Sequence, residues 1–193
     1  MDPSNGYEKI AEQFLEHREH DVERTGASAV SGWAKTLAPA AAVLDLGCGS
    51  GIPISQVFME AGMKVYGIDA SPTMIGRFRS NFPGSNAACE SIEQSSFFDR
   101  SFDAIIAWGL LFLLPENSQE SLIKKVAGAL KPHGKFLFTA PHQKVEWTDV
   151  MSKHTSRSLG GRKYRKLISE NGLSLMREFD DKAGNHYFCA EKI

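Results

Sequence analysis

Three glycines and a nearby carboxylate carry the most specific chemical signal in this chain. The stretch VLDLGCGSG places Gly47, Gly49 and Gly51 at the end of an apolar run, with Asp45 two residues before the first of them. Glycine adopts positive φ readily and lets a ligand approach the backbone without a Cβ in the way. Because a tight strand-to-helix turn needs only one such residue, three in alternation predict a ligand-binding turn.

The carboxylates indicate which ligand this turn binds. In GIDAS, Asp69 lies about 20 residues beyond the turn, where an acidic side chain accepts hydrogen bonds from ribose hydroxyls. The alternative, that Asp69 caps the next helix, is weakened because Ser71 already occupies the cap position. The spacing G-x-G-x-G differs from the dinucleotide fingerprint G-x-G-x-x-G, and Asp45 would repel a pyrophosphate. S-adenosylmethionine, a cationic ribose-bearing ligand without phosphate, fits these residues.

Strands and helices alternate from about residue 40 onward. Apolar runs of strand length predict strands at residues 40–47, 64–69, 85–91, 101–109 and 135–141. Apolar residues at helical spacing predict helices at residues 53–62, 71–82, 117–134 and 161–172, and two more, at 6–18 and 22–38, before the first strand. Two alternating runs near the C-terminus predict a hairpin, at residues 173–181 and 185–193.

This order of elements predicts a doubly wound α/β fold, because parallel strands need right-handed crossovers long enough to hold a helix. We expect a mostly parallel, seven-stranded, Rossmann-like sheet with an antiparallel C-terminal edge strand. Residues 1–193 are expected to form one domain, with N-terminal helices within 1–38 and the sheet core from about residue 40. The polar stretch 141–160 is expected to be an insertion.

Composition narrows the classes of partner. The chain has 193 residues, 42% of them hydrophobic, and a formal net charge of −1, which gives no electrostatic footprint for nucleic acid or an anionic membrane. It has no apolar run of the roughly 20 residues that a membrane span needs, and its polar N-terminus predicts no signal peptide. Cys48, Cys89 and Cys189 have no metal-ligand spacing, so we expect no metal site and a cytoplasmic location.

Taken together, the motifs resemble those of the class I S-adenosylmethionine-dependent methyltransferases of the compact small-molecule type. The resemblance covers residues from about 40 to the C-terminus, and His133 stands where the family usually has the first Gly of LKPGG. The stretches similar to family motifs are VLDLGCGSG, GIDAS, FDAIIAWGLLFLLP, ALKPHGKFLFTAP and the N-terminal YEKIAEQF. The resemblance implies methyl transfer from S-adenosylmethionine.

The resemblance also implies a set of cofactor-binding residues. The methionyl part of the cofactor would lie against the glycine turn, with Asp45 at its amino group and Asp69 at the ribose. The full set is Tyr7, Asp45, Gly47, Cys48, Gly49, Gly51, Asp69, Ala70, Met74, Glu90, Ser91, Ile92, Trp108, Gly109 and Leu110. Plainer roles stay open for three of them: an exposed loop carboxylate for Glu90, a core aromatic for Trp108 and helix packing for Tyr7.

Residues outside the glycine motif are expected to bind the methyl acceptor. A general base is needed only if the nucleophile must lose a proton, so no catalytic residue is assigned. His142, at the end of the predicted fifth strand, is the candidate base, with a solvated loop histidine as the alternative. Residues 141–164 have the length and polarity of an acceptor-binding insertion, in which Trp147, Asp149 and His154 are candidate contacts.

The acceptor itself is expected to be a small molecule. AWGL follows the fourth strand where nucleic-acid amino-methylating members of this family carry N-P-P-Y or D-P-P-Y. The run Leu110–Pro115 predicts either a partly hydrophobic acceptor pocket or core, and a few basic residues between 157 and 166 predict a solvated face. Two rival functions stay open: a non-catalytic S-adenosylmethionine-binding module and, disfavoured by the glycine spacing, a nicotinamide-dependent oxidoreductase. The acceptor's identity and the oligomeric state are not predicted.

Overall fold

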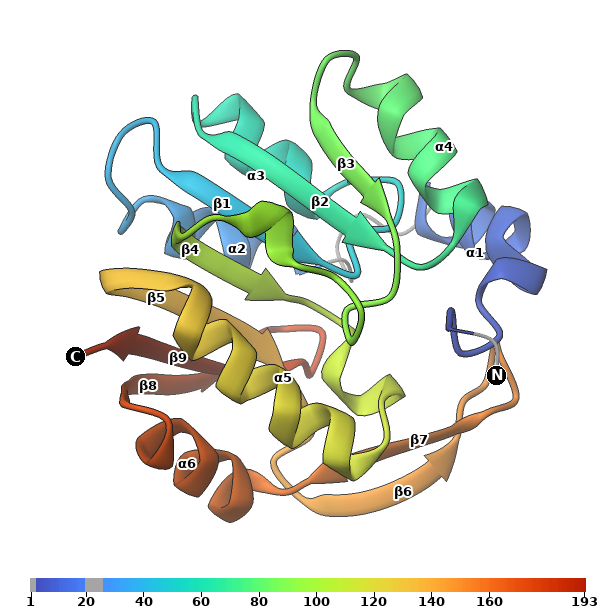
Figure 1. The fold of residues 1–193 in the computed structure, drawn as a ribbon. Helices are drawn as coiled ribbons and strands as arrows, with labels where there is room; N and C mark the ends of the chain where they lie inside the picture. Colours follow the sequence, from blue (N-terminus) through green and yellow to red (C-terminus); the bar gives the residue numbers. More distant parts are fainter. Residues whose placement is uncertain (1–2, 20–25) are drawn as a thin grey trace.

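The computed structural model describes residues 3–19 and 26–193. Seven strands of the described chain form one sheet: β1 (Ala42–Leu46), β2 (Lys64–Asp69), β3 (Asn86–Cys89), β4 (Phe102–Ala107), β5 (Leu130–Thr139), β8 (Leu173–Asp180) and β9 (His186–Lys192). Their order across the sheet is β3-β2-β1-β4-β5-β9-β8 (Figure 1). Strands β1 to β5 are parallel, whereas β9 is antiparallel to both β5 and β8. The predicted doubly wound, mostly parallel sheet is confirmed, and β9 lies one place in from the edge strand β8.

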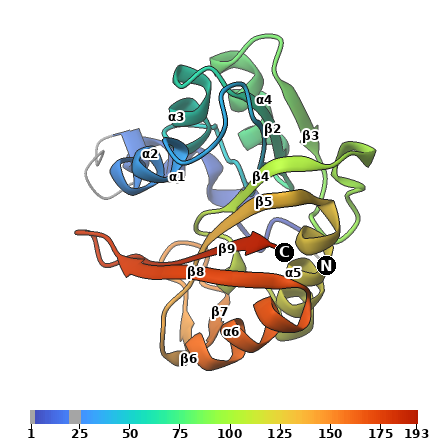
Figure 2. The same cartoon turned by 90° about the vertical axis from the view of Figure 1, so that its left-hand side faces the viewer.

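Helices cover both faces of this sheet. One face packs against α2 (Ala27–Ala34), α3 (Ile54–Glu60) and α4 (Pro72–Asn81), and the other against α5 (Glu116–Ala129) and α6 (Gly161–Glu170) (Figure 2). Neighbouring residues of β1 serve opposite faces: Val43 joins the core under α2 and α3, and Leu44 the core under α5 and α6. Among the described residues, no helix is long and apolar enough to cross a membrane.

Two predicted helix boundaries are confirmed. The Ser71 side chain caps α4 by accepting a hydrogen bond from the Met74 N–H at 3.1 Å, with Pro72 as first helical residue, as predicted. Helix α5 ends at Ala129, just before the Lys131-Pro132 pair that closes the helical pattern in the sequence. Leu130 already adopts extended backbone angles and pairs with Phe102 of β4.

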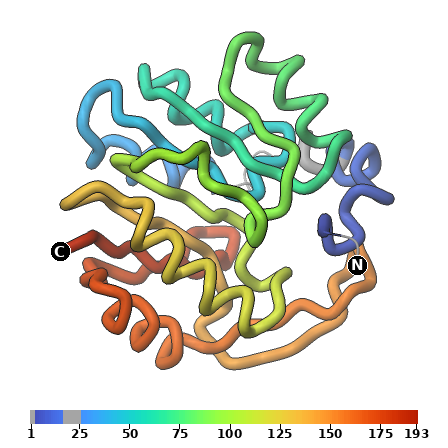
Figure 3. The backbone as a smooth tube through the Cα atoms, in the orientation of Figure 1, coloured from blue at the N-terminus to red at the C-terminus, as the bar shows by residue number. Residues whose placement is uncertain are grey.

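The stretch predicted as a polar insertion forms a hairpin of its own. Strands β6 (Lys144–Thr148) and β7 (Thr155–Leu159) pair antiparallel in a separate two-stranded sheet. The tip of this hairpin lies beside the N-terminal segment (Figure 3), because the Tyr7 hydroxyl donates to Asp149 Oδ2 at 3.4 Å. The N-terminal segment and the β6–β7 hairpin, which are far apart in the sequence, therefore meet at one edge of the fold.

A fully buried glutamine ties this hairpin to the core. The Gln119 Nε2 group on α5 donates to the Leu114 carbonyl at 2.9 Å and to the Arg157 carbonyl at 3.1 Å. Its Oε1 accepts from the Tyr164 hydroxyl at 2.7 Å, and that hydroxyl accepts from the Leu159 N–H at 3.2 Å. The amide thus joins α5, β7, α6 and the short helix η4 (Leu111–Leu113).

Replacing Gln119 by leucine is expected to destabilise the fold by about 3 kcal/mol, because each buried polar group left without a partner costs about 1–3 kcal/mol. Urea denaturation measures this loss. The matched control is Ser118→Ala on the same helix, which should change the free energy of unfolding by less than about 0.5 kcal/mol. A loss below about 1 kcal/mol for Gln119→Leu would show that the network does not hold the hairpin.

Candidate active site

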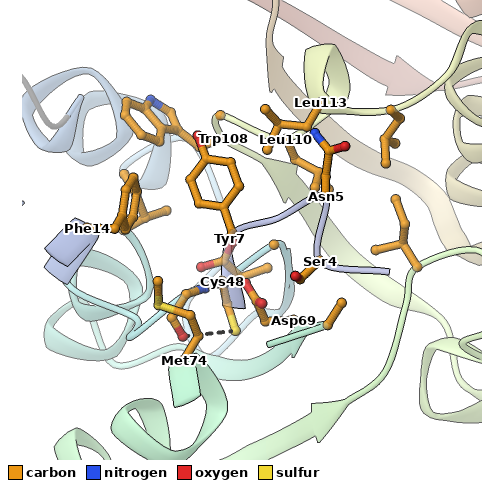
Figure 4. Close-up of a pocket in the computed structure, with 18 of the residues that line it drawn as sticks. Ser4, Asn5, Tyr7, Phe14, Cys48, Asp69, Met74, Trp108, Leu110 and Leu113 are labelled. Atoms are coloured by element: carbon orange, nitrogen blue, oxygen red, sulfur yellow. Dashed lines mark hydrogen bonds between the residues drawn. The ribbon is translucent and has the colours of Figure 1, made fainter. Parts of the chain in front are cut away.

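A pocket of about 210 Å³ lies at the carboxyl ends of β1, β2 and β4. Figure 4 shows Cys48, Asp69, Met74 and Trp108 around it, with Tyr7 between Trp108 and Cys48 in this view. The structure brings twelve of the fifteen predicted residues into the lining: Tyr7, Asp45, Gly47, Cys48, Gly49, Asp69, Ala70, Met74, Ile92, Trp108, Gly109 and Leu110. These residues come from five separate segments, so the fold assembles the pocket.

Three predicted residues do not line this pocket. Gly51 has φ +80°, and a Cβ there would lie 2.5 Å from Phe82 Cε2. A glycine is therefore needed at this position because the turn packs closely against the end of α4. Glu90 and Ser91 lie just beyond β3, where the Glu90 N–H donates to the Asp69 carbonyl at 3.0 Å. The following turn carries Glu93 into the lining instead.

The glycine turn has the conformation that its sequence predicts. Gly47 and Gly49 have φ of +69° and +54°, which L side chains rarely adopt. A Cβ on Gly47 would lie 3.0 Å from Leu110 Cδ1. The N–H groups of Gly47 and Cys48 both donate to the Ile68 carbonyl, at 2.8 and 3.1 Å. The turn is therefore bent back onto the end of β2, where Asp69 lies.

Asp69 joins the two segments that form the floor of the pocket. Its Oδ2 accepts from the Gly49 N–H and its Oδ1 from the Ser71 N–H, each at 2.9 Å. Burial raises the pKa of the Asp69 carboxyl and the charge of Glu8 adds to this, although the hydrogen bonds from Ser71 and Gly49 lower it. A carboxylate has about four lone-pair sites, so these two bonds leave acceptor capacity for a ligand.

A second carboxylate lies deeper in the pocket. Asp45 is 2% exposed, and its Oδ2 accepts from the Ser55 hydroxyl at 2.6 Å. Burial raises the pKa of the Cys48 thiol well above its usual value, and the charges of Asp45 and Asp69 raise it further. Cys48 is therefore a neutral, packed thiol, and the two carboxylates make the pocket electronegative.

The N-terminal segment forms a roof over this pocket. Glu8 accepts hydrogen bonds at the start of α4, from the Ser71 hydroxyl and, at 2.8 Å, from the Thr73 hydroxyl. Lining residues that the sequence reasoning missed include three in this segment and several elsewhere: Pro3, Ser4, Asn5, Phe14, Ser50, Ile52, Ile54, Glu93, Phe112, Leu113 and Leu114. The last three belong to the run Leu110–Pro115, for which the sequence predicts acceptor pocket or core: Leu111 is fully buried core, and the acceptor-pocket interpretation stays a prediction.

Comparisons with known proteins agree with this architecture. Residues 43–134 match a family model described as a methyltransferase domain. A magnesium protoporphyrin IX methyltransferase from Synechocystis, solved with bound S-adenosylmethionine, superposes with a TM-score of 0.71 at 20% identity, over 88% of this chain and 79% of that one. Residues 43–134 therefore match a methyltransferase domain, and the fold around them is that of the class I S-adenosylmethionine-dependent methyltransferases.

Two curated relatives of the chain carry names that differ in whether they specify a substrate. An uncharacterized methyltransferase from Synechocystis is 31% identical over 111 residues, which are 58% of this chain and 52% of that protein. A tRNA N(3)-cytidine methyltransferase from Gallus gallus is 34% identical over 107 residues, 49% of this chain and 29% of that protein. The chain spans about half the length of the first curated relatives it matches.

Trp108 lines the pocket and also packs against the core under α2 and α3. Its indole Nε1–H donates to the Tyr187 hydroxyl at 3.0 Å, and that hydroxyl donates to Asp181 Oδ2 at 2.8 Å. Gly26 lies so close that a Cβ there would be 2.4 Å from Trp108 Nε1. The hydrogen bond to Tyr187 and the close backbone at Gly26 therefore hold the Trp108 ring in one orientation.

The residues predicted to contact the methyl acceptor do not line the main pocket. His142 and Trp147 line a second hollow, and the His142 Nε2 atom lies 3.1 Å from Arg165 Nη2. A guanidinium only donates hydrogen bonds, so the Nε2 lone pair of His142 is occupied by Arg165 in this arrangement. Asp149 contacts Tyr7, and His154 lies against Gly6.

Tyr187→Phe is expected to loosen the Trp108 ring, because the indole N–H then loses its hydroxyl partner. Loss of one such bond is worth about 1 kcal/mol, or about a fivefold weaker affinity for S-adenosylhomocysteine by calorimetry. The Nε1–H resonance of Trp108 should shift in the same variant. Tyr66→Phe is the matched control, since the Tyr66 hydroxyl contacts Arg100. An unmoved resonance with unchanged affinity would contradict this role.

Proposed function

We propose that this protein transfers a methyl group from S-adenosylmethionine to a small-molecule acceptor. The observation that supports this most is the joining of the Gly47–Gly49 turn to Asp69 at the carboxyl ends of β1 and β2. Open α/β sheets bind ligands at this edge, outside the carboxyl ends of their strands. The matched methyltransferase domain and the pocket lining point to the same activity.

The lining residues fit the proposed cofactor. Gly49 presents backbone without a side chain, and Asp45 and Asp69 supply negative charge for a ligand with an ammonium and a sulfonium group. Asp69 has acceptor capacity for ribose hydroxyls, and Met74 and Ile92 offer apolar surface for adenine. In this proposal Asp69 contacts the ribose, and Met74 and Ile92 contact the adenine.

The cofactor supplies a methyl carbon that is activated by its positively charged sulfur. The residues of the chain then contribute binding, orientation and the exclusion of water, which together lower the barrier of an in-line displacement. The roof formed by residues 3–7 excludes water, and Trp108, fixed through Tyr187, presents a rigid ring at the end of β4. We assign no general base.

A small-molecule acceptor is favoured over a nucleic acid by the surface charge. Four of the five basic residues of β7 and α6 are paired with carboxylates: Arg157 with Glu146, Lys163 with Glu120, Arg165 with Glu178 and Lys166 with Glu170. Paired charges on a chain of net charge −1 give little attraction for phosphates. The three cysteines are free thiols, which supports a reducing, cytoplasmic setting.

Formation of S-adenosylhomocysteine tests this function. Purified protein, S-adenosylmethionine and a panel of small phenols, amines and thiols should give product that depends on the acceptor, while tRNA should give none. Product with tRNA alone would overturn the acceptor class. Cofactor binding without turnover on any acceptor would favour the rival function, a non-catalytic binding module, and reduction of a nicotinamide cofactor would favour an oxidoreductase.

Asp69→Ala is expected to weaken S-adenosylhomocysteine binding more than tenfold, or by at least about 1.4 kcal/mol, because the ribose loses its acceptor. Isothermal titration calorimetry measures the affinity. Asp69→Asn keeps one acceptor oxygen for the glycine turn and should show a similar loss while remaining folded. The control is Asp99→Ala, which removes an exposed carboxylate that does not line the pocket. Unchanged affinity in both Asp69 variants would remove this residue from the site.

A further inference from the structure

A second hollow, of about 670 Å³, adjoins the cofactor pocket. Phe112 lines both spaces. The two are also connected through the sheet, because the Gly109 N–H at the end of β4 donates to the Thr139 hydroxyl at the end of β5, at 2.8 Å. Gly109 lines the first space and Thr139 the second, so a molecule in the second hollow lies next to the methyl-transfer site.

Aromatic rings form much of the wall of this hollow. Phe112 and Trp147 are in contact, with ring centroids 5.6 Å apart, and His142 and His186 are edge to face at 5.2 Å. Rings of this kind bind planar molecules through stacked or edge-to-face contacts. The hairpin supplies Trp147, which gives the β6–β7 segment a place in ligand binding.

Glu178, Asp180 and His186 line the hollow, and Arg165 lies beside it. Arg165 Nε and Nη2 donate to the two oxygens of Glu178, at 2.6 and 2.7 Å, so the guanidinium charge is already matched. His186 Nε2 lies 3.4 Å from Glu178 Oε2, and His186 Nδ1 lies 2.7 Å from Asp180 Oδ1. The hydrogen bond from Arg165 lowers the pKa of Glu178, which keeps this carboxyl ionised.

Counted formally, the two carboxylates exceed the one guanidinium by a single negative charge when both imidazoles are neutral. Asp180 is the group that a ligand can reach, because its side chain is 70% exposed whereas those of Glu178 and His186 are 15% and 12% exposed. Both nitrogens of His186 face carboxylates, and the His142 Nε2 atom faces Arg165. The hollow is thus arranged to hold a ligand rather than to remove a proton from it.

We propose that this hollow binds the methyl acceptor, and that the acceptor is an aromatic molecule with a cationic amine, which pairs with Asp180. The ring lies against Phe112 and Trp147, from where its nucleophilic atom reaches the cofactor pocket. An aromatic carboxylate of the same size is repelled by Asp180 and Glu178. This inference rests on the proposed function, since it assigns the acceptor of the same site.

Three probes with a shared phenol ring test the charge preference: tyramine, the neutral 4-ethylphenol and the anionic 4-hydroxyphenylacetate. Each is titrated by calorimetry into the protein saturated with S-adenosylhomocysteine. Tyramine should bind at least tenfold more tightly than 4-hydroxyphenylacetate, with 4-ethylphenol between them. Equal or tighter binding of the anion, or no binding of any probe, would overturn the proposal.

Two substitutions test whether Asp180 causes the preference for the cationic probe over the anionic one. Asp180→Asn should remove most of the difference between tyramine and 4-hydroxyphenylacetate, and Asp180→Lys should invert it. Asp99→Asn, which changes net charge equally at an exposed site, should leave the difference in place. A preference that survives Asp180→Lys would place the amine elsewhere. Failure of S-adenosylhomocysteine itself to bind would instead contradict the proposed function, so the two failures are distinguishable.

Discussion

The carboxylate of Asp69 is the interaction on which the rest of the site depends. By accepting from Gly49 and Ser71 at once, it fixes the glycine turn after β1 against the start of α4. Those two segments come from neighbouring strands whose carboxyl ends meet at one edge of a parallel sheet. The same group is then available to a ribose. A structural bond and a proposed ligand bond thus share one side chain.

The roof over the pocket depends on the same corner of the fold. Glu8 accepts from Ser71 and Thr73 at the beginning of α4, and Tyr7 reaches Asp149 on the β6–β7 hairpin. The segment that covers the cofactor pocket is therefore attached on one side to the helix that follows Asp69. On its other side it is attached to the hairpin that carries Trp147 into the second hollow. The elements that cover the pocket and the second hollow are thus in contact with each other.

The parts of this architecture that sequence predicts are those with local causes. Helix α4 follows from Ser71 and Pro72, and the positive φ at Gly47 and Gly49 follows from their residue type. The N-terminal roof has no local signal, because Tyr7 and Asp149 are 142 residues apart in the sequence. The β6–β7 hairpin escaped prediction since its strands are mostly polar and lie outside the main sheet, so neither shows a clear alternation of buried and exposed residues. Glu93 replaced Glu90 in the lining because the turn after β3 decides which side chain faces inward.

A crystal structure of the protein with S-adenosylhomocysteine would show whether Asp69 and the glycine turn bind the cofactor. We expect the ribose hydroxyls within hydrogen-bond distance of the Asp69 carboxylate and the amino acid portion against the Gly47–Gly49 turn. The sulfur should face the end of β4, toward Phe112 and the second hollow. A ligand bound elsewhere, or a ribose out of reach of Asp69, would contradict this binding mode.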